Sequence, residues 1–407
     1  MLRKGTFILM KTKIQDMTSG SPGRLIILFA IPLMLGNICQ QLYTMVDTMV
    51  VGQVAGVEAL AALGAVDFLM WVVTGISTGL TQGFSIQLSQ YYGAKDFENL
   101  RKSLAHSYRL TAFIAAGVLI LSQSFASLVL TGLHTPSNII GMSLLYLRII
   151  FCGIPATAAY NMFASALRAM GNSKTPLTAM IIASVLNVSL DILFVAGFGW
   201  GVAGAAIATV IAQSFSAVYC FLILRRIDIV HLTRADFMPA SGMNARLMKL
   251  GIPVVFQNII IGVGGLVVQY VINGYGFLFV AGFTATNKLY GLLEMAAISY
   301  GYAIVTYVGQ NLGAGKIDRI RKGVRSSMLL SLLTSLIISA AMFLFGKNIL
   351  SLFISGEPQQ TQQVLAIAFK YLSIMAGHAL GFVLPVRVQI CTSGAGRYLN
   401  AYGKWYG

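Results

Sequence analysis

Charged residues are scarce in this chain, and their scarcity excludes most classes of soluble protein. Only 10% of the 407 residues are Asp, Glu, Lys or Arg, whereas 57% are hydrophobic. So few charges cannot cover the surface of a water-soluble core of this size. Apolar runs long enough to cross a bilayer, roughly 20 residues each, recur along the sequence. The composition therefore predicts an all-α polytopic membrane protein.

Motifs for catalysis and metal binding are also lacking. The four cysteines have no paired or metal-type spacing, and the four histidines form no metal-binding pattern. The sequence contains no phosphate-binding loop, no Ser-His-Asp pattern and no zinc motif. We therefore predict that the chain is not an enzyme and binds no cofactor. The missing nucleotide-binding motif favours coupling to an ion gradient over coupling to ATP.

Positive charge is abundant by comparison, with a net charge of +16, and it is concentrated in alternate loops. This alternation predicts a multi-pass protein of the plasma (inner) membrane with a cytoplasmic N-terminus, because loops rich in Lys and Arg stay in the cytoplasm. The charge therefore orients the protein and does not indicate a nucleic-acid partner. The basic loops lie near 4–24, 95–102, 168–174, 225–249 and 316–325, and loops without Lys or Arg lie near 52–58, 131–138, 197–201 and 273–277.

An internal repeat divides the chain into two similar halves. Two blocks of residues recur about 220 positions later, which is far longer than the period of a solenoid. In a membrane protein, such a repeat is typical of a transporter built from two related lobes. The recurring residues are Ile31, Pro32, Asn37, Gln90, Gly93, Ala94, Arg101 and Lys102, matched by Ile252, Pro253, Asn258, Gln310, Gly313, Ala314, Arg321 and Lys322.

The predicted spans give a domain plan in which the second half is shorter than the first. After about residue 376 the pattern of the first half is lost, and we interpret the tail as the result of a frameshift or truncation; a natural ten-span variant is the alternative. Spans are predicted at 25–51, 57–90, 99–130, 137–167, 174–197, 201–224, 246–273, 278–309, 323–346 and 362–384. The plan is a cytoplasmic segment (1–24), an N-lobe (25–224), a linker (225–245), a C-lobe of about four spans (246–376) and an atypical tail (377–407).

Four of the twelve acidic residues fall within predicted spans, namely Asp47, Asp67, Asp191 and Glu294. An ionised, unpaired carboxylate costs several kcal/mol inside a bilayer, so each is a candidate functional residue. Asp67 and Glu294 are the weaker candidates. Each could line a wet cavity, and Lys288 precedes Glu294 by six residues.

Polar side chains recur at helical spacing near Asp47 and Asp191. Asn187 precedes Asp191 by one helical turn, so the two side chains share a face. A buried carboxylate can bind and release a proton near neutral pH, and a cluster of oxygens can instead hold Na⁺. Structural hydrogen bonding is the alternative interpretation. The further polar residues are Gln40, Gln41 and Tyr43 before Asp47, and Thr209 with Gln213 one turn later.

Several of these segments together resemble the multidrug and toxic compound extrusion (MATE) family. They are Pro32 with Asp47, Arg168-Ala-Met-Gly-Asn-Ser173 with Pro176, Asn187-x3-Asp191, and Gly199-Trp-Gly-Val-Ala-Gly-Ala-Ala-x-Ala-Thr209-x3-Gln213. The resemblance implies two pseudo-symmetric six-helix lobes around a central cavity, with the C-lobe here lacking its last two helices. It also implies export of organic cations in exchange for H⁺ or Na⁺ by alternating access.

The resemblance also implies roles for individual residues, and it is nearest to the DNA-damage-inducible branch of the family. Pro32 corresponds to a hinge in the first helix. The cation and proton coupling site corresponds to Asp47, Asn161, Asn187, Asp191 and Thr209, of which all but Asn161 are candidate Na⁺ ligands. The expected substrate cavity contains Tyr43, Gln41, Gln213, Lys288 and Glu294.

The expected partners are a small organic, cationic substrate and the lipid bilayer, with no nucleic acid, and the expected state is a monomer. Two other functions stay open. One is a flippase for lipid-linked precursors from the same superfamily. The other is a remnant that no longer transports because its C-terminus is altered. The sequence does not choose between H⁺ and Na⁺.

Overall fold

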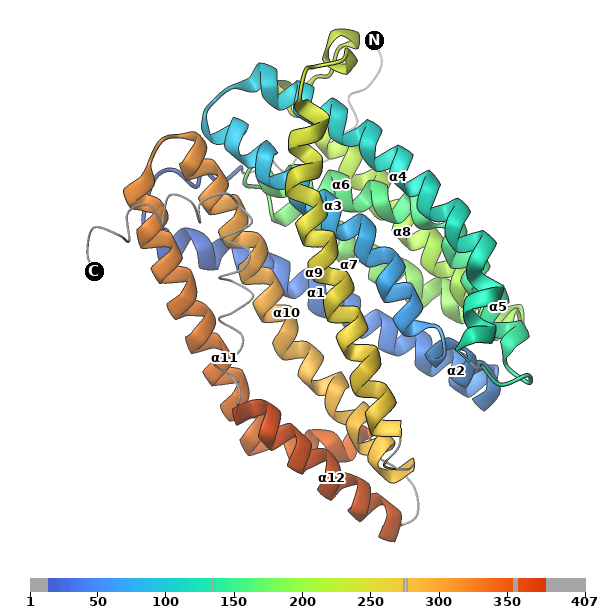
Figure 1. Ribbon diagram of the computed structural model, residues 1–407. Helices are drawn as coiled ribbons and strands as arrows, with labels where there is room; N and C mark the ends of the chain where they lie inside the picture. Colours follow the sequence, from blue (N-terminus) through green and yellow to red (C-terminus); the bar gives the residue numbers. More distant parts are fainter. Residues whose placement is uncertain (1–13, 134, 274, 276, 354–357, 378–407) are drawn as a thin grey trace, which may run out of the picture.

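The computed structural model describes residues 14–133, 135–273, 275, 277–353 and 358–377, and all regular structure in these ranges is helical (Figure 1). The prediction of an all-α membrane protein is confirmed. The first half contains α1 (Pro22–Val54), α2 (Val57–Gly64), α3 (Asp67–Gly93), α4 (Phe97–Gly132), α5 (Ile140–Cys152), α6 (Ile154–Ala169), α7 (Lys174–Asp191), the π-helix η1 (Ile192–Gly197) and α8 (Gly201–Arg225). Two short 3₁₀ turns (Asp228–Val230 and Arg234–Phe237) precede α9 (Met243–Asn273), α10 (Phe277–Gly313), α11 (Ile317–Phe353) and α12 (Pro358–Gly377).

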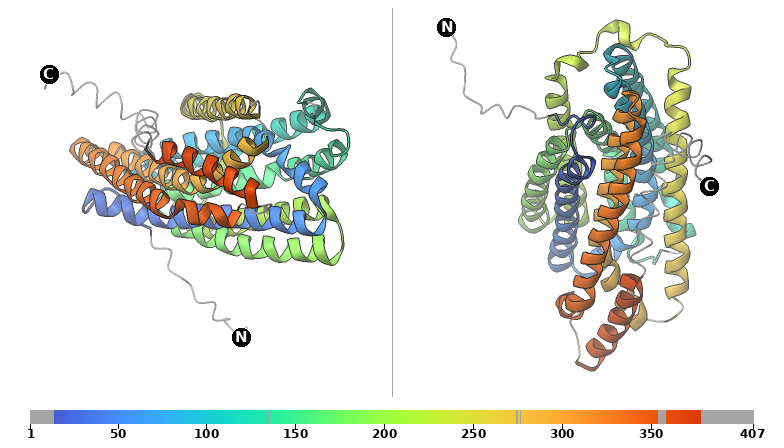
Figure 2. Two further views of the ribbon diagram at one scale, coloured as in Figure 1. Left: turned by 90° about the horizontal axis from the view of Figure 1, so that it is seen from below. Right: turned by 90° about the vertical axis from the view of Figure 1, so that its left-hand side faces the viewer.

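Most of these helices are long and apolar enough to cross a membrane. Among the described residues eight single helices qualify by length and composition, or nine spans if α5 and α6 count as one. These two helices bend by 46° at Gly153, just before Pro155. Proline cannot donate a backbone hydrogen bond, which explains the break. The axes of the long helices are roughly aligned in the right-hand view of Figure 2, and helices such as α10 and α11, joined by a short loop, run in opposite directions.

The tenth predicted span overlaps α12, which is described only as far as Gly377. The expected change in pattern after residue 376, and the atypical tail, lie almost entirely outside the described residues. Both therefore stay predictions, as do the domain boundaries.

The loops rich in Lys and Arg gather at one end of the helices, which we call the basic end. Hydrogen bonds join residues 15–20, the α6–α7 loop and the α10–α11 loop there. The α8–α9 linker reaches the same end, where Asp236 of the linker contacts Arg101 of α4.

The first helix of each half packs against the other half. Helix α1 lies against α10, and α9 lies against α3. Asn37 of α1 donates a hydrogen bond to Ser299 Oγ of α10 (3.2 Å), and its repeat counterpart Asn258 of α9 donates to the carbonyl of Gly75 in α3 (3.0 Å). The internal repeat is thus visible as two equivalent contacts between the halves.

Glycine allows the closest approach between α3 and α9. A Cβ atom on Gly83 would overlap the backbone of Gly251, so no larger residue fits without moving a helix. Small residues permit such contacts between helices in lipid. The contact between the halves therefore depends on the absence of a side chain at this position.

We predict that Gly83→Ala lowers the free energy of unfolding by about 1–3 kcal/mol, because an added methyl group must push α3 and α9 apart. Gly117→Ala in α4 is the matched control, since a Cβ atom there meets nothing within 4 Å. Thermal unfolding in detergent measures both variants. Equal melting temperatures for the two variants would show that the contact is not tightly packed.

Candidate functional site

Asp47 and Asp191 are buried together in the first half. Asp47 lies on α1 and is 6% exposed, and Asp191 ends α7 and is 0% exposed. Their carboxyl groups are close enough to interact electrostatically. Helix α1 packs along α7 and touches η1, which brings two residues far apart in the sequence into one cluster.

The local conformation after Asp191 is unusual. Helix α7 continues directly into the π-helix η1, and π-type turns occur frequently at functional sites. The chain then reverses through Gly199 and Gly201, whose φ angles of 69° and 53° favour glycine. This tight reversal places α8 beside α7.

Helix α8 adds two polar side chains to the cluster. Asn187 Nδ2 donates to Thr209 Oγ1 (3.4 Å), which links α7 to α8. Gln213 Nε2 donates to the hydroxyl of Tyr43 (3.3 Å), which links α8 to α1. The residues that the structure brings together are Tyr43, Asp47, Asn187, Asp191, Thr209 and Gln213, which we call the acceptor cluster.

The acceptor cluster contains oxygens without hydrogen-bond partners. Five buried oxygens have none: Oδ1 of Asp47, Oδ1 of Asn187, both carboxylate oxygens of Asp191, and Oε1 of Gln213. Each unsatisfied buried acceptor costs about 1–3 kcal/mol. A proton would satisfy two of them, one by the O–H bond and one by the hydrogen bond that this O–H donates. A cation could contact several at once, and hard oxygen ligands suit ions such as Na⁺.

The remaining predicted residues lie apart from these contacts. Asn161 of α6 donates to Thr78 Oγ1 of α3 (3.2 Å), a partner that no sequence pattern had indicated. Gln41 is half-buried on α1, and Glu294 is exposed on α10 in the second half. The Lys288 side chain is outside the described part of the structure.

Asp67 is closer to the cluster than its sequence position indicated. It is exposed at the first turn of α3, yet near enough to Asp47 for their charges to interact. Within the described residues, no group of three or more His, Cys, Asp and Glu side chains could hold a metal ion. The cluster therefore differs from a transition-metal centre, because amide and hydroxyl oxygens supply much of it.

Comparison with known proteins identifies the family. The model of the MatE family matches residues 32–193 and 253–399, which is more than half of the chain. The chain belongs to the MATE family. This MATE protein is 31% identical to the probable multidrug resistance protein YpnP of Bacillus subtilis over 363 residues, covering 88% of this chain and 81% of the relative.

Further relatives agree with this assignment. The probable multidrug resistance protein YoeA of Bacillus subtilis is 28% identical over 368 residues, covering 88% of the MATE protein described here and 78% of YoeA. A transporter of the MOP superfamily from Pyrococcus furiosus has the same fold, with a TM-score of 0.87 at 22% identity, covering 95% of this chain and 86% of that one. The match includes both halves of the chain.

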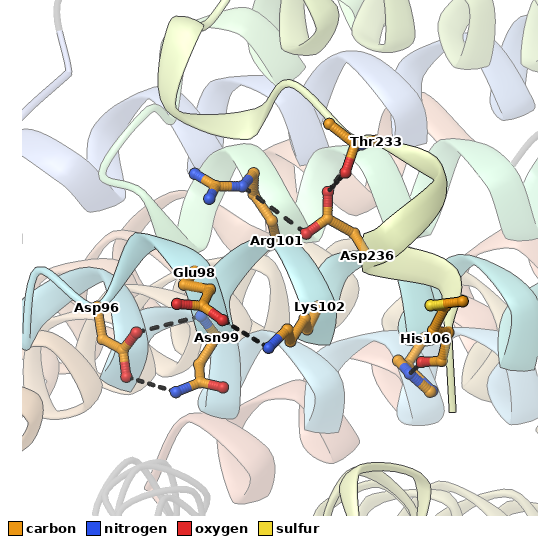
Figure 3. A network of polar contacts seen from close by, with 9 residues as sticks. Asp96, Glu98, Asn99, Arg101, Lys102, His106, Thr233 and Asp236 are labelled. Carbon is orange, nitrogen blue, oxygen red and sulfur yellow. Dashed lines mark hydrogen bonds and ion pairs between the residues drawn. The ribbon is translucent and has the colours of Figure 1, made fainter. Parts of the chain in front are cut away.

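We predict that Asp191→Asn leaves the melting temperature of the protein unchanged or raises it, because the amide removes an unsatisfied charge. The matched control is Asp236→Asn in the linker. That buried carboxylate accepts hydrogen bonds from the backbone N–H of Thr233 (2.7 Å) and from its hydroxyl (2.8 Å), and it contacts Arg101 (Figure 3). The control should lose about 1–3 kcal/mol of the free energy of unfolding, and its melting temperature should fall accordingly. A melting temperature of Asp191→Asn clearly below that of the unaltered chain would contradict the prediction.

Proposed function

We propose that this MATE protein is a secondary active antiporter that exports organic cations or drugs in exchange for H⁺ or Na⁺. The observation that supports this most is the acceptor cluster, with five buried oxygens that have no donor. An unpartnered carboxylate in a membrane-spanning helix is a candidate ion site. The relatives named as probable multidrug resistance proteins support a small-molecule substrate.

The mechanism follows from competition for these oxygens. Asp47 and Asp191 would bind either the coupling ion or the positive charge of the substrate, and Tyr43 would offer an aromatic surface beside them. Because binding of one displaces the other, the free energy of the ion gradient can drive export. The two halves would expose the cluster alternately to each side of the membrane.

The orientation and branch are part of the proposal. The basic end would face the cytoplasm of a plasma membrane, since Lys and Arg favour that side. The position of the cluster in the first half supports the likeness to the DNA-damage-inducible branch. Pro32, inside α1 about four helical turns before Asp47, would act as the hinge. We expect the transporter to work as a monomer.

We predict that Asp47→Asn and Asp191→Asn each abolish drug resistance without reducing the amount of protein in the membrane. Each substitution removes a charge that the substrate and the ion share. Glu58→Gln is the control, because Glu58 is an exposed carboxylate on α2. Growth of a drug-sensitive bacterial strain in a dilution series of cationic dyes measures resistance. Full resistance in both aspartate variants would reject the site.

We further predict that one ion gradient, and not both, drives accumulation of a cationic dye by the unaltered chain in proteoliposomes. The gradients of H⁺ and Na⁺ are imposed separately, with liposomes lacking protein as the control. Acceleration by a pH gradient alone would assign H⁺, and acceleration by a sodium gradient alone would assign Na⁺. A dye flux that neither gradient changes would contradict the antiport proposal for this chain.

A further inference from the structure

The chain segment before α1 lies across the boundary between the two halves at the basic end. We call residues 15–21 the strap. The backbone N–H of Gln15 donates to the carbonyl of Gly171 (3.1 Å), in the α6–α7 loop of the first half. Gly171 has a φ of 93°, and a Cβ atom there would overlap the carbonyl oxygen of Gln15. The strap therefore requires glycine at this position.

The other side of the strap is bonded to the second half. Its backbone forms hydrogen bonds with four side chains of the α10–α11 region. Met17 N donates to Gln310 Oε1 (3.1 Å), and Asn311 Nδ2 donates to the Met17 carbonyl (2.9 Å). Lys316 donates to the carbonyl of Thr18 (2.9 Å), and Arg319 donates to that of Gly20 (2.9 Å). The strap thus ties the first half to the second.

Gln310 is the central residue of these contacts. Its side chain is fully buried, and it accepts from Met17 N through Oε1 while it donates through Nε2 to the carbonyl of Ala169 (2.8 Å). One amide group therefore connects α10, the strap and the end of α6. Losing this side chain would leave a buried donor and a buried acceptor unsatisfied at the boundary.

Close to the strap, helices α3 and α10 cross at Gly93 and Gly313, two glycines at equivalent positions of the internal repeat. A Cβ atom on Gly93 would overlap the carbonyl oxygen of Gln310, and one on Gly313 would overlap that of Gln90. The Gln-x2-Gly motif of each half thus contacts the same motif of the other half. The boundary is closed here by backbone packed against backbone, with no room for a side chain.

One further contact crosses the boundary at this end, and local hydrogen bonds stabilise the strap itself. The guanidinium of Arg168, on α6, lies 4.5 Å from the ring centre of Tyr302 on α10. Within the strap, Asp16 accepts hydrogen bonds from Thr18 N (2.8 Å) and Ser19 Oγ (2.9 Å). Burial raises the pKa of Asp16, but these hydrogen bonds and the nearby charge of Lys316 outweigh burial and lower the pKa overall. The ionised carboxylate therefore stabilises the turn of the strap.

We propose that the strap and the glycine crossing form a latch, which holds the basic end of the two halves closed until Gln310 releases Met17 and Ala169. The latch rests on the alternating access proposed above. Opening this end requires the halves to separate. Separation must either break the hydrogen bonds from the strap to the second half or bend the strap away from the first half, which breaks the bond from Gln15 to Gly171. Weakening either attachment should shift the equilibrium toward the open state.

Two substitutions test the two attachments separately. Gly171→Ala should displace the strap from the first half, and Gln310→Ala should detach it from the second. Gly242→Ala is the matched control for the first substitution, since Gly242 also has a left-handed φ of 74° but a Cβ atom there meets nothing within 4 Å. The control carries the backbone strain of the glycine substitution without the contact.

The measurement is the distance between spin labels, which needs no transport activity. Cysteines replace Lys102 on α4 and Lys322 on α11 at the basic end, in a chain whose native cysteines are changed to serine. We expect the population with a long distance to rise several-fold in Gly171→Ala and Gln310→Ala, and to stay unchanged in Gly242→Ala. A second pair at Thr131 and Ser351, toward the opposite end, guards against misfolding, because unfolding would broaden both distributions.

Distance distributions that match the control in both variants would overturn the latch, and so would an equal response in Gly242→Ala. The result is separate from the proposed antiport. A latch can respond in these variants even if the chain moves no dye, and dye transport can continue when the distances do not respond. Failure of one proposal is therefore distinguishable from failure of the other.

Discussion

The structure depends most on the lack of water inside a bilayer, where every buried polar group needs a partner from the protein. Nearly all helix backbone groups satisfy one another, and side chains such as Asn37 and Asn258 find partners across the halves. Some buried amide and hydroxyl oxygens elsewhere also have no partner, but the acceptor cluster is where carboxylates, those of Asp47 and Asp191, keep buried oxygens without donors among the described residues. Such a deficit persists in a membrane protein when an ion or a proton supplies the missing partner.

Many of the contacts that hold the two halves together are made by the backbone. Glycines at 83, 93, 251 and 313 bring helices into backbone contact, and the strap adds bonds from its main chain. The proposed alternating access requires that these contacts break when the basic end opens. In the proposed mechanism the acceptor cluster and the boundary would have separate tasks, because the cluster would bind the ion and the boundary would decide which side is open.

Much of this architecture was predictable from the sequence. The helical class followed from the apolar runs. The scarcity of acids and the one-turn spacing of Asn187 and Asp191 marked candidate residues, and the resemblance to the MATE family implied that Asp47, Asp191 and Thr209 form one site. The repeat drew attention to Gln310. Its hydrogen bond to the strap could not be predicted, because the partner is the backbone N–H of Met17, and a backbone group has no signature in the sequence. The contact of Asn161 with Thr78 was missed for a similar reason, because one threonine among many carries no signal.

The central claim is that Asp47 and Asp191 bind the coupling ion and the substrate in turn. Ion release on substrate binding tests this most directly. Purified protein in detergent is mixed with tetraphenylphosphonium, and released protons are followed with a pH indicator in weak buffer while released ²²Na⁺ is counted in parallel. The account predicts that the unaltered chain releases one of the two ions and that the double variant Asp47→Asn, Asp191→Asn releases none. Equal release from both proteins would contradict it.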